Sequence, residues 1–147
     1  MKTFRIAVLL FSAIALATPC FAHHMAVVVS RENSVENLTS AQLGKVIRAE
    51  TKKWGDGKDI MLVLHRSSPG ETLTLQRLNK MSAAQWQQWM NEHKERITLV
   101  DSDEEILNLV GKSPGAVGLV DVRSVNDRVK VVHVDGKLPL ENGYLPH

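Results

Sequence analysis

The sequence has a single cysteine, few aromatic residues and almost no excess of one charge. Its 147 residues include one Cys, at position 20, and Phe, Trp and Tyr together make up 5%. A lone cysteine forms neither an internal disulfide nor a zinc site of cysteine pairs. The net charge of +2 comes without a dense basic run, so there is no electrostatic footprint for nucleic acid. The chain therefore depends on an apolar core for its stability.

Long hydrophobic runs are also absent, except at the N-terminus. There, Lys2 and Arg5 lead into the apolar stretch 6–17, and the segment 18–22 follows it. That stretch is shorter than the roughly 20 residues that span a bilayer, which argues against a membrane anchor. The order of charged, apolar and small residues is typical of a secretory signal peptide. We expect residues 1–22 to be removed, with cleavage after Ala22.

Removal of this signal changes what the working protein contains. Cys20 would leave with it, and the loss of Lys2 and Arg5 would leave equal numbers of acidic and basic residues. The alternative is a lipoprotein anchored through Cys20, although Pro19 fits poorly before a lipid-modified cysteine. Residues 23–147 are enough for one ordinary domain and too few for two.

The mature part alternates short apolar runs with helical patterns. Short segments rich in apolar and β-branched residues predict strands at 26–29, 60–64, 116–120 and 129–134. A hydroxyl residue followed three residues later by Gln or Glu predicts helices after Thr39, Ser82 and Ser102. A fourth helix is predicted after Ser68, and Gly111 is expected to end the helix that follows Ser102. Strands that alternate with helices predict an α/β fold with a mixed or mostly parallel sheet flanked by helices.

Two of the three tryptophans, Trp86 and Trp89, are three residues apart on one predicted helix. Such a pair either packs in the core or forms an exposed aromatic patch for a partner. Core packing is the favoured interpretation, because each ring has a large apolar area to bury.

Five segments, taken in order, resemble one known family. They are Val27–Val29, Leu38–Leu43, Trp54–Gly57, Arg66–Thr72 and Ser113–Val120. This series is similar to the phosphate-binding, substrate-capturing proteins of ABC transporters, which have the type 2 periplasmic-binding-protein fold. The resemblance implies a single lobe of that two-lobed fold, in the periplasm of a double-membraned cell. One lobe alone would leave a bound anion facing water, so we expect weak, salt-sensitive binding.

The loop from Arg66 to Thr72 is the best candidate for a binding site. It lies between a predicted buried strand and a helix, where free N–H groups, hydroxyls and a forked guanidinium can hold a tetrahedral anion. We predict that phosphate or another oxyanion is bound by Arg66, Ser67, Ser68, Gly70 and Thr72.

This loop departs from the pattern of the family, which is approximately Arg-x-x-Gly-Ser-Gly-Thr. Arg66 and Thr72 match its ends, whereas Pro69 removes an N–H donor and Glu71 brings a negative charge beside the anion. The alternative is a plain helix start, with Ser68 as the cap, Pro69 in the first turn and Glu71 complementing the helix dipole. Both interpretations stay open at this point.

No metal site, cofactor or catalytic residue is predicted. His23 and His24 lack further ligands nearby, and the acids of 101–105 suit the dipole of the helix that follows them. His65 lies near Ser67 but without an orienting acid. We therefore predict a non-enzymatic phosphate- or oxyanion-binding module, with no nucleic acid partner and no membrane insertion after cleavage. The alternative is an interaction or sensory accessory module that has lost ligand binding and docks to an envelope protein or to itself.

Overall fold

The structure is a computed structural model of the chain and describes residues 24–146. The predicted signal peptide, residues 1–22, lies outside the described residues, so its removal stays a prediction. Within residues 24–146, no helix combines the length and the apolar character needed to cross a membrane.

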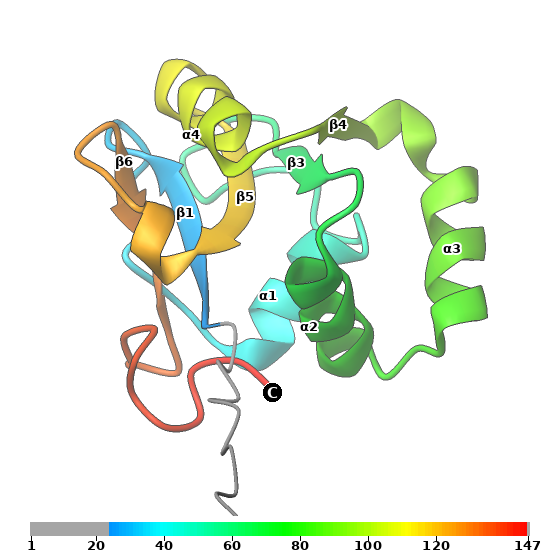
Figure 1. Cartoon of the computed structure of the whole chain (residues 1–147). Helices are drawn as coiled ribbons and strands as arrows, with labels where there is room; N and C mark the ends of the chain where they lie inside the picture. The colour runs from blue at the N-terminus through cyan, green and yellow to red at the C-terminus, as the bar shows by residue number, and fades with distance from the viewer. Residues whose placement is uncertain (1–23, 147) are drawn as a thin grey trace, which may run out of the picture.

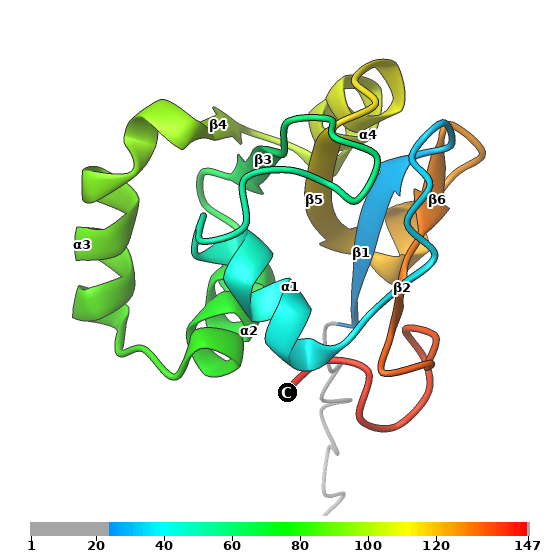
Figure 2. The same ribbon diagram turned by 180° about the vertical axis from the view of Figure 1, so that it is seen from behind.

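A five-stranded sheet forms the centre of the molecule (Figures 1 and 2). The strands are β1 (Met25–Ser30), β2 (Asn37–Leu38), β3 (Met61–His65), β4 (Ile97–Val100), β5 (Ala116–Asp121), β6 (Val129–Val131) and β7 (His133–Val134). The sheet has the order β4-β3-β5-β1-β6, with β3 parallel to β4 and β5, and β1 antiparallel to β5 and β6. Strands β2 and β7 pair in parallel as a separate, smaller sheet. The predicted α/β fold with a mixed sheet is confirmed.

Helices cover both faces of this sheet. They are α1 (Ser40–Ile47), α2 (Pro69–Asn79), α3 (Ala83–Glu92) and α4 (Asp103–Lys112), with short 3₁₀ turns η1 (Lys94–Arg96) and η2 (Val122–Ser124). Helix α4 packs on one face through Ile106, Leu107 and Val110, whereas α1 and α2 pack on the other. Residues 62–64 of β3 are buried, as predicted for a strand covered on both sides.

Helix α3 lies at the side of the molecule, near the edge strand β4 (Figure 1). Trp86 and Trp89 are buried and belong to the same core cluster as α1 and α2. Their rings stack with centroids 5.0 Å apart, and Trp89 stacks in turn on His93 at 4.5 Å. The preferred interpretation of the tryptophan pair, core packing, is therefore confirmed.

The predicted helix starts agree with the structure. Thr39 and Ser82 each form a complete capping box, in which the side chain three residues later bonds back to the cap's N–H. Ser102 caps α4 by accepting the N–H of Glu105, but the Glu105 carboxylate accepts the N–H of Asp101 instead of that of Ser102. The third box is thus only half formed.

Two predictions of element boundaries are wrong. Gly111 does not end α4, because the helix continues to Lys112 and Ser113 is its C-cap. Gly111 instead allows a close approach of the chain at Arg128, whose carbonyl oxygen would lie 3.1 Å from a Cβ at position 111. The run 129–134 is not one strand, because it breaks at Val132 into β6 and β7. Strand β4 was not predicted from the sequence.

Segments that carry the family resemblance contact one another. The carbonyl of Gly115 accepts hydrogen bonds from the indole N–H of Trp54 at 2.9 Å and from the N–H of Met61 at 3.0 Å. A Cβ at Gly115 would lie 2.0 Å from the carbonyl oxygen of Asp59, so no other residue fits there without movement of the backbone. Sequence positions far apart are thereby joined at the beginning of β3.

Candidate functional site

The predicted loop connects the carboxyl end of β3 to α2. Arg66 and Ser67 form a turn, Ser68 is the N-cap of α2 and Pro69 is its first residue. The Ser68 hydroxyl accepts the N–H of Glu71 at 3.3 Å, and the Ser68 carbonyl accepts the N–H of Thr72 at 3.0 Å. Ser68 and Pro69 thus have the roles of an ordinary helix start.

Several hydrogen-bond donors at this helix start remain unused. The N–H groups of Ser68 and Gly70 and the hydroxyls of Ser67 and Thr72 have no acceptor among residues 24–146. The N–H of Ser67 donates to Nδ1 of His65 at 3.1 Å. A helix N-terminus also carries a partial positive charge, so the loop keeps donors and a field that favour an anion.

Arg66 is held at the surface by a residue of the neighbouring strand end. Its backbone N–H donates to the carbonyl of Val100 at 2.7 Å, and its Nε lies 3.3 Å from Oδ1 of Asp101. The two strands are parallel and in register at His65 and Val100, which brings their carboxyl ends together. Both side chains of the ion pair are more than half exposed, so an anion would have to compete with Asp101 for the guanidinium.

Glu71 is the acid inside this loop, and it is almost completely buried, with 2% of its surface exposed. Oε1 accepts the N–H of His65 at 2.9 Å, whereas Oε2 is buried without a partner in the described part of the chain. Burial raises the pKa of Glu71 to about 8, against the opposing effect of the His65 N–H, and the nearby charge of Asp103 adds to the rise. The carboxyl is therefore mainly neutral at pH 7.

This burial corrects two expectations for Glu71. Its side chain does not bring a full negative charge beside the loop at neutral pH, and it is not a surface acid that complements the helix dipole. A neutral carboxyl carries one O–H donor, and Oε2 has no acceptor among residues 24–146.

A small cavity of about 60 Å³ lies beside the loop, against α3. This volume has room for about four waters or one small ion. Of the five predicted site residues, Arg66 and Thr72 line it, whereas Ser67, Ser68 and Gly70 lie in the adjoining loop and do not. Glu71 and Trp86 form part of its wall. The sequence placed Glu71 in the loop but did not indicate its burial. It gave no sign that Trp86 of α3 lies beside the loop, because that contact depends on how the helices pack.

The structure does not assemble a nucleophile with a base at this loop. His65 and Ser67 meet through the backbone N–H of Ser67, not through its hydroxyl. Within residues 24–146, no group of three or more His, Cys, Asp or Glu side chains has an arrangement that could hold a metal ion.

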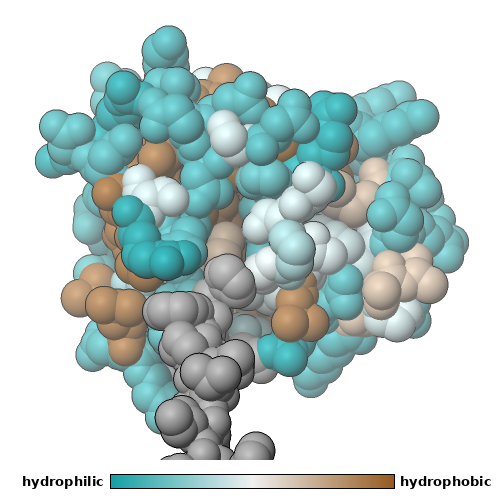
Figure 3. All heavy atoms as spheres, viewed as in Figure 1, coloured by the Kyte–Doolittle hydropathy of each residue, from teal (hydrophilic) through white to brown (hydrophobic). Residues whose placement is uncertain are grey.

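The surface offers no evident large apolar face in the view of Figure 3, where hydrophilic residues surround small separate hydrophobic patches. The large apolar side chains that are exposed among the described residues are Leu73, Leu99, Leu138 and Leu140. They come from α2, β4 and the C-terminal segment, so they do not lie together on the face of a single helix or strand.

The comparisons with known proteins concern the fold. No protein-family model matches the sequence. An ABC-type phosphate transport receptor from Vibrio cholerae matches with a TM-score of 0.66 and 22% identity, over 79% of this chain and 48% of that chain. A putative phosphate ABC transporter substrate-binding protein from Clostridium perfringens, solved with bound phosphate, matches with a TM-score of 0.66 and 23% identity, over 79% and 46%. PstS from Borrelia burgdorferi matches with a TM-score of 0.64 and 16% identity, over 79% and 49%.

The chain thus spans about half the length of the solved structures it matches. At these identities the likeness concerns the fold, and it confirms the resemblance at that level. Residues 24–146 have the architecture of part of a phosphate ABC transporter substrate-binding protein, with the loop from Arg66 to Thr72 at the end of a central parallel strand.

Proposed function

We propose that this chain is a non-enzymatic module that binds a small oxyanion such as phosphate at the start of α2. The bound anion would contact Arg66, Ser67, Ser68, Gly70 and Thr72. We further propose that residues 1–22 direct the chain to the periplasm, where residues 23–147 act as one domain. The shared fold supports a substrate-binding role, and the phosphate bound to the Clostridium perfringens protein suggests the class of anion.

The observation that carries this proposal is the set of unused donors beside a neutral acid. Two N–H groups and two hydroxyls at the start of α2 have no acceptor among the described residues. Glu71, which would repel an anion if it were ionised, has a pKa raised to about 8 by burial. At pH 7 the loop therefore offers donors and the Arg66 charge, with the Asp101 carboxylate as the nearest competitor.

Binding at this site is expected to be weak. Arg66 is 61% exposed, so its attraction for an anion is screened by water and salt. Charge-assisted hydrogen bonds from N–H and hydroxyl groups add affinity, because they are stronger than neutral ones. The anion would also neutralise the positive end of α2.

Isothermal titration calorimetry with sodium phosphate at low salt tests the proposal. We expect saturable heat with the wild type and a loss of affinity of about tenfold or more in Arg66→Ala, since hydrogen bonds to charged groups contribute strongly. Arg77→Ala is the matched control, because Arg77 is an exposed arginine in the last turn of the same helix. Equal losses in the two variants, or no heat with the wild type, would overturn the proposed site.

A further inference from the structure

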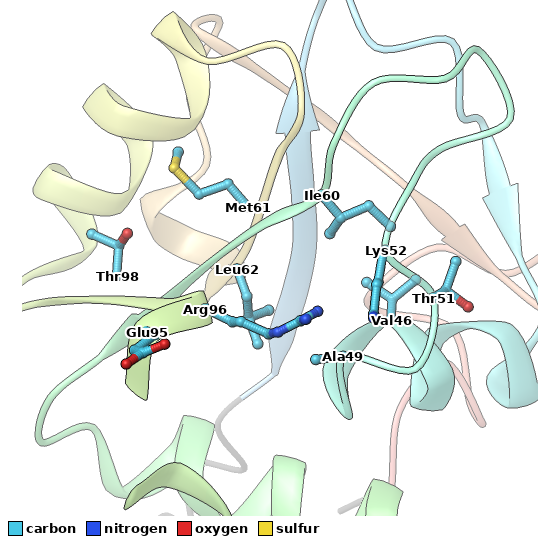
Figure 4. Close-up of a pocket in the computed structure, with 10 residues that line it drawn as sticks. All are labelled: Val46, Ala49, Thr51, Lys52, Ile60, Met61, Leu62, Glu95, Arg96 and Thr98. Atoms are coloured by element: carbon cyan, nitrogen blue, oxygen red, sulfur yellow. The ribbon is translucent and has the colours of Figure 1, made fainter. Parts of the chain in front are cut away.

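A second cavity lies at the opposite end of β3 from the proposed oxyanion loop. Its volume is about 350 Å³, and it is an open pocket lined by the end of α1, the segment that follows it, the beginning of β3 and the beginning of β4 (Figure 4). Leu62 lines this cavity near the start of the strand, whereas Arg66 follows the strand's other end. Four residues of a strand span about 13 Å, so the two sites are separate.

The floor of this cavity is apolar. Val46 of α1 and Leu62 of β3 are buried core residues, each 3% exposed, and half-buried Ala49 and Ile60 extend the same surface. Apolar surface of this kind binds the hydrocarbon part of a ligand, and the volume is at the lower end of the range for small-molecule sites.

Two cations, Lys52 and Arg96, line the cavity beside this floor. Figure 4 shows both side chains directed toward the same gap near Ala49, with Glu95 on the far side of Arg96 from Lys52. Neither Lys52 nor Arg96 has a side-chain hydrogen bond or an ion pair within residues 24–146. By contrast, four other arginines pair with a carboxylate: Arg48, Arg66, Arg123 and Arg128. Two like charges directed at one gap are stabilised when an anion lies between them.

The backbone fixes both cations relative to the floor. The carbonyl of Lys52 accepts the N–H of Ile60 at 2.9 Å, which ties the segment after α1 to the start of β3. Arg96 ends the short 3₁₀ turn before β4, its N–H donates to His93 at 2.8 Å, and the next residue, Ile97, is in register with Leu62. The cationic pair and the apolar floor therefore belong to one preformed pocket.

We propose that this pocket binds a small organic acid with a hydrophobic body. The carboxylate lies between Lys52 and Arg96, and the hydrocarbon part covers Val46, Ala49, Ile60 and Leu62. This site is independent of the proposed oxyanion loop, since it shares no residue with it.

The test is a titration of the ¹⁵N-labelled protein, residues 23–147, with sodium octanoate, followed by amide chemical shifts. We expect saturable shifts at Ala49, Lys52 and Leu62. Arg96→Gln and Lys52→Gln should each weaken octanoate binding about two- to fivefold, the range for ion pairs of exposed side chains such as these. Lys94→Gln, which changes an exposed lysine of the same turn that does not line the pocket, should leave binding unchanged.

Two further ligands test the apolar floor and the cation pair of the pocket separately. Octanol lacks the carboxylate, so its binding should not change in Arg96→Gln. Acetate lacks the long hydrocarbon chain, so it should give no saturable shifts. The proposal is overturned if octanoate moves no pocket amide, if Lys94→Gln weakens binding as much as Arg96→Gln does, or if inorganic phosphate shifts the same amides as strongly as octanoate. Arg66→Ala should not affect octanoate, so failure here is distinguishable from failure of the proposed function.

Discussion

Among single residues, Glu71 has the largest expected effect on how stability depends on pH. Its pKa is about 8 in the folded protein, because burial disfavours the charged form, against 4.5 as the reference value. The folded state therefore holds this proton more tightly than the unfolded state does. The resulting stabilisation is complete below about pH 4.5 and is lost as the pH rises through 8.

We expect the free energy of unfolding to fall between pH 5 and pH 9 by several kcal/mol, up to about 5 kcal/mol. Urea unfolding at pH 5, 7 and 9 measures this change. Glu71→Gln should remove most of the dependence, because the amide accepts the His65 N–H without ionising. Glu32→Gln, at an exposed acid, should behave like the wild type. A pH dependence that survives in Glu71→Gln would show that other groups cause it.

Tyr144 is the second residue with a specific energetic role. Its buried hydroxyl donates to the carbonyl of Val132 at 2.6 Å and accepts the N–H of Val27 at 3.1 Å, and burial raises its pKa to about 12. Tyr144→Phe leaves two buried backbone groups without this partner, so we expect a loss of about 1–3 kcal/mol in the free energy of unfolding. Urea unfolding at pH 7 is the measurement, and a loss below about 0.5 kcal/mol, typical of surface changes, would contradict this role.

At the scale of elements, the features that could be predicted from the sequence are those that depend on neighbouring residues. The features that depend on contacts between distant segments could not be predicted. Thr39 and Ser82 could be recognised as helix starts because a capping box needs only four consecutive residues. The break between β6 and β7 at Val132 could not be recognised from the sequence, because it depends on Tyr144 and on the pairing of His133 with Asn37. Strand β4 has only four residues, of which Ile97 alone is buried, so it is too short for a clear apolar pattern.

In the candidate site too, the locally determined features were predictable and those that depend on packing were not. Ser68 and Pro69 were predictable as a helix start, since their roles come from local backbone chemistry. The burial of Glu71 was not, because an acid in the first turn of a helix is ordinary on an exposed surface. Only the packing of α2 and α3 around the loop shows that this acid is buried and neutral.

Gly115, just before β5, tests the contact between the beginning of that strand and the segment that runs from Trp54 to the beginning of β3. A Cβ there would meet the Asp59 carbonyl at 2.0 Å, so Gly115→Ala should destabilise the fold by about 1–3 kcal/mol through backbone movement. Gly55→Ala is the control, because nothing lies within 4 Å of a Cβ at that position. Thermal unfolding compares the two variants, and equal midpoints would contradict the close approach at Gly115.

At the scale of the whole molecule, Arg66 is exposed in the described chain, and the chain spans about half the length of its structural neighbours. Asp101 and a bound anion then compete for the same guanidinium. We expect Asp101→Asn to strengthen phosphate binding about two- to fivefold at low salt and by less at higher salt, because salt screens the interactions of exposed charges. Calorimetry at 20 and 150 mM NaCl checks this. Asp127→Asn, an exposed acid of the loop before β6, should change nothing, and a weaker affinity in Asp101→Asn would argue against the competition.

The most direct measurement of the central claim follows the unused donors themselves. In a phosphate titration at pH 7, the amide resonances of Ser68 and Gly70 should shift and saturate, as expected for N–H groups that gain a charged acceptor. The same shifts should be strongly reduced in Arg66→Ala and retained in Arg77→Ala. Amides of Ser68 and Gly70 that do not move, while phosphate shifts residues elsewhere, would contradict an oxyanion site at the start of α2.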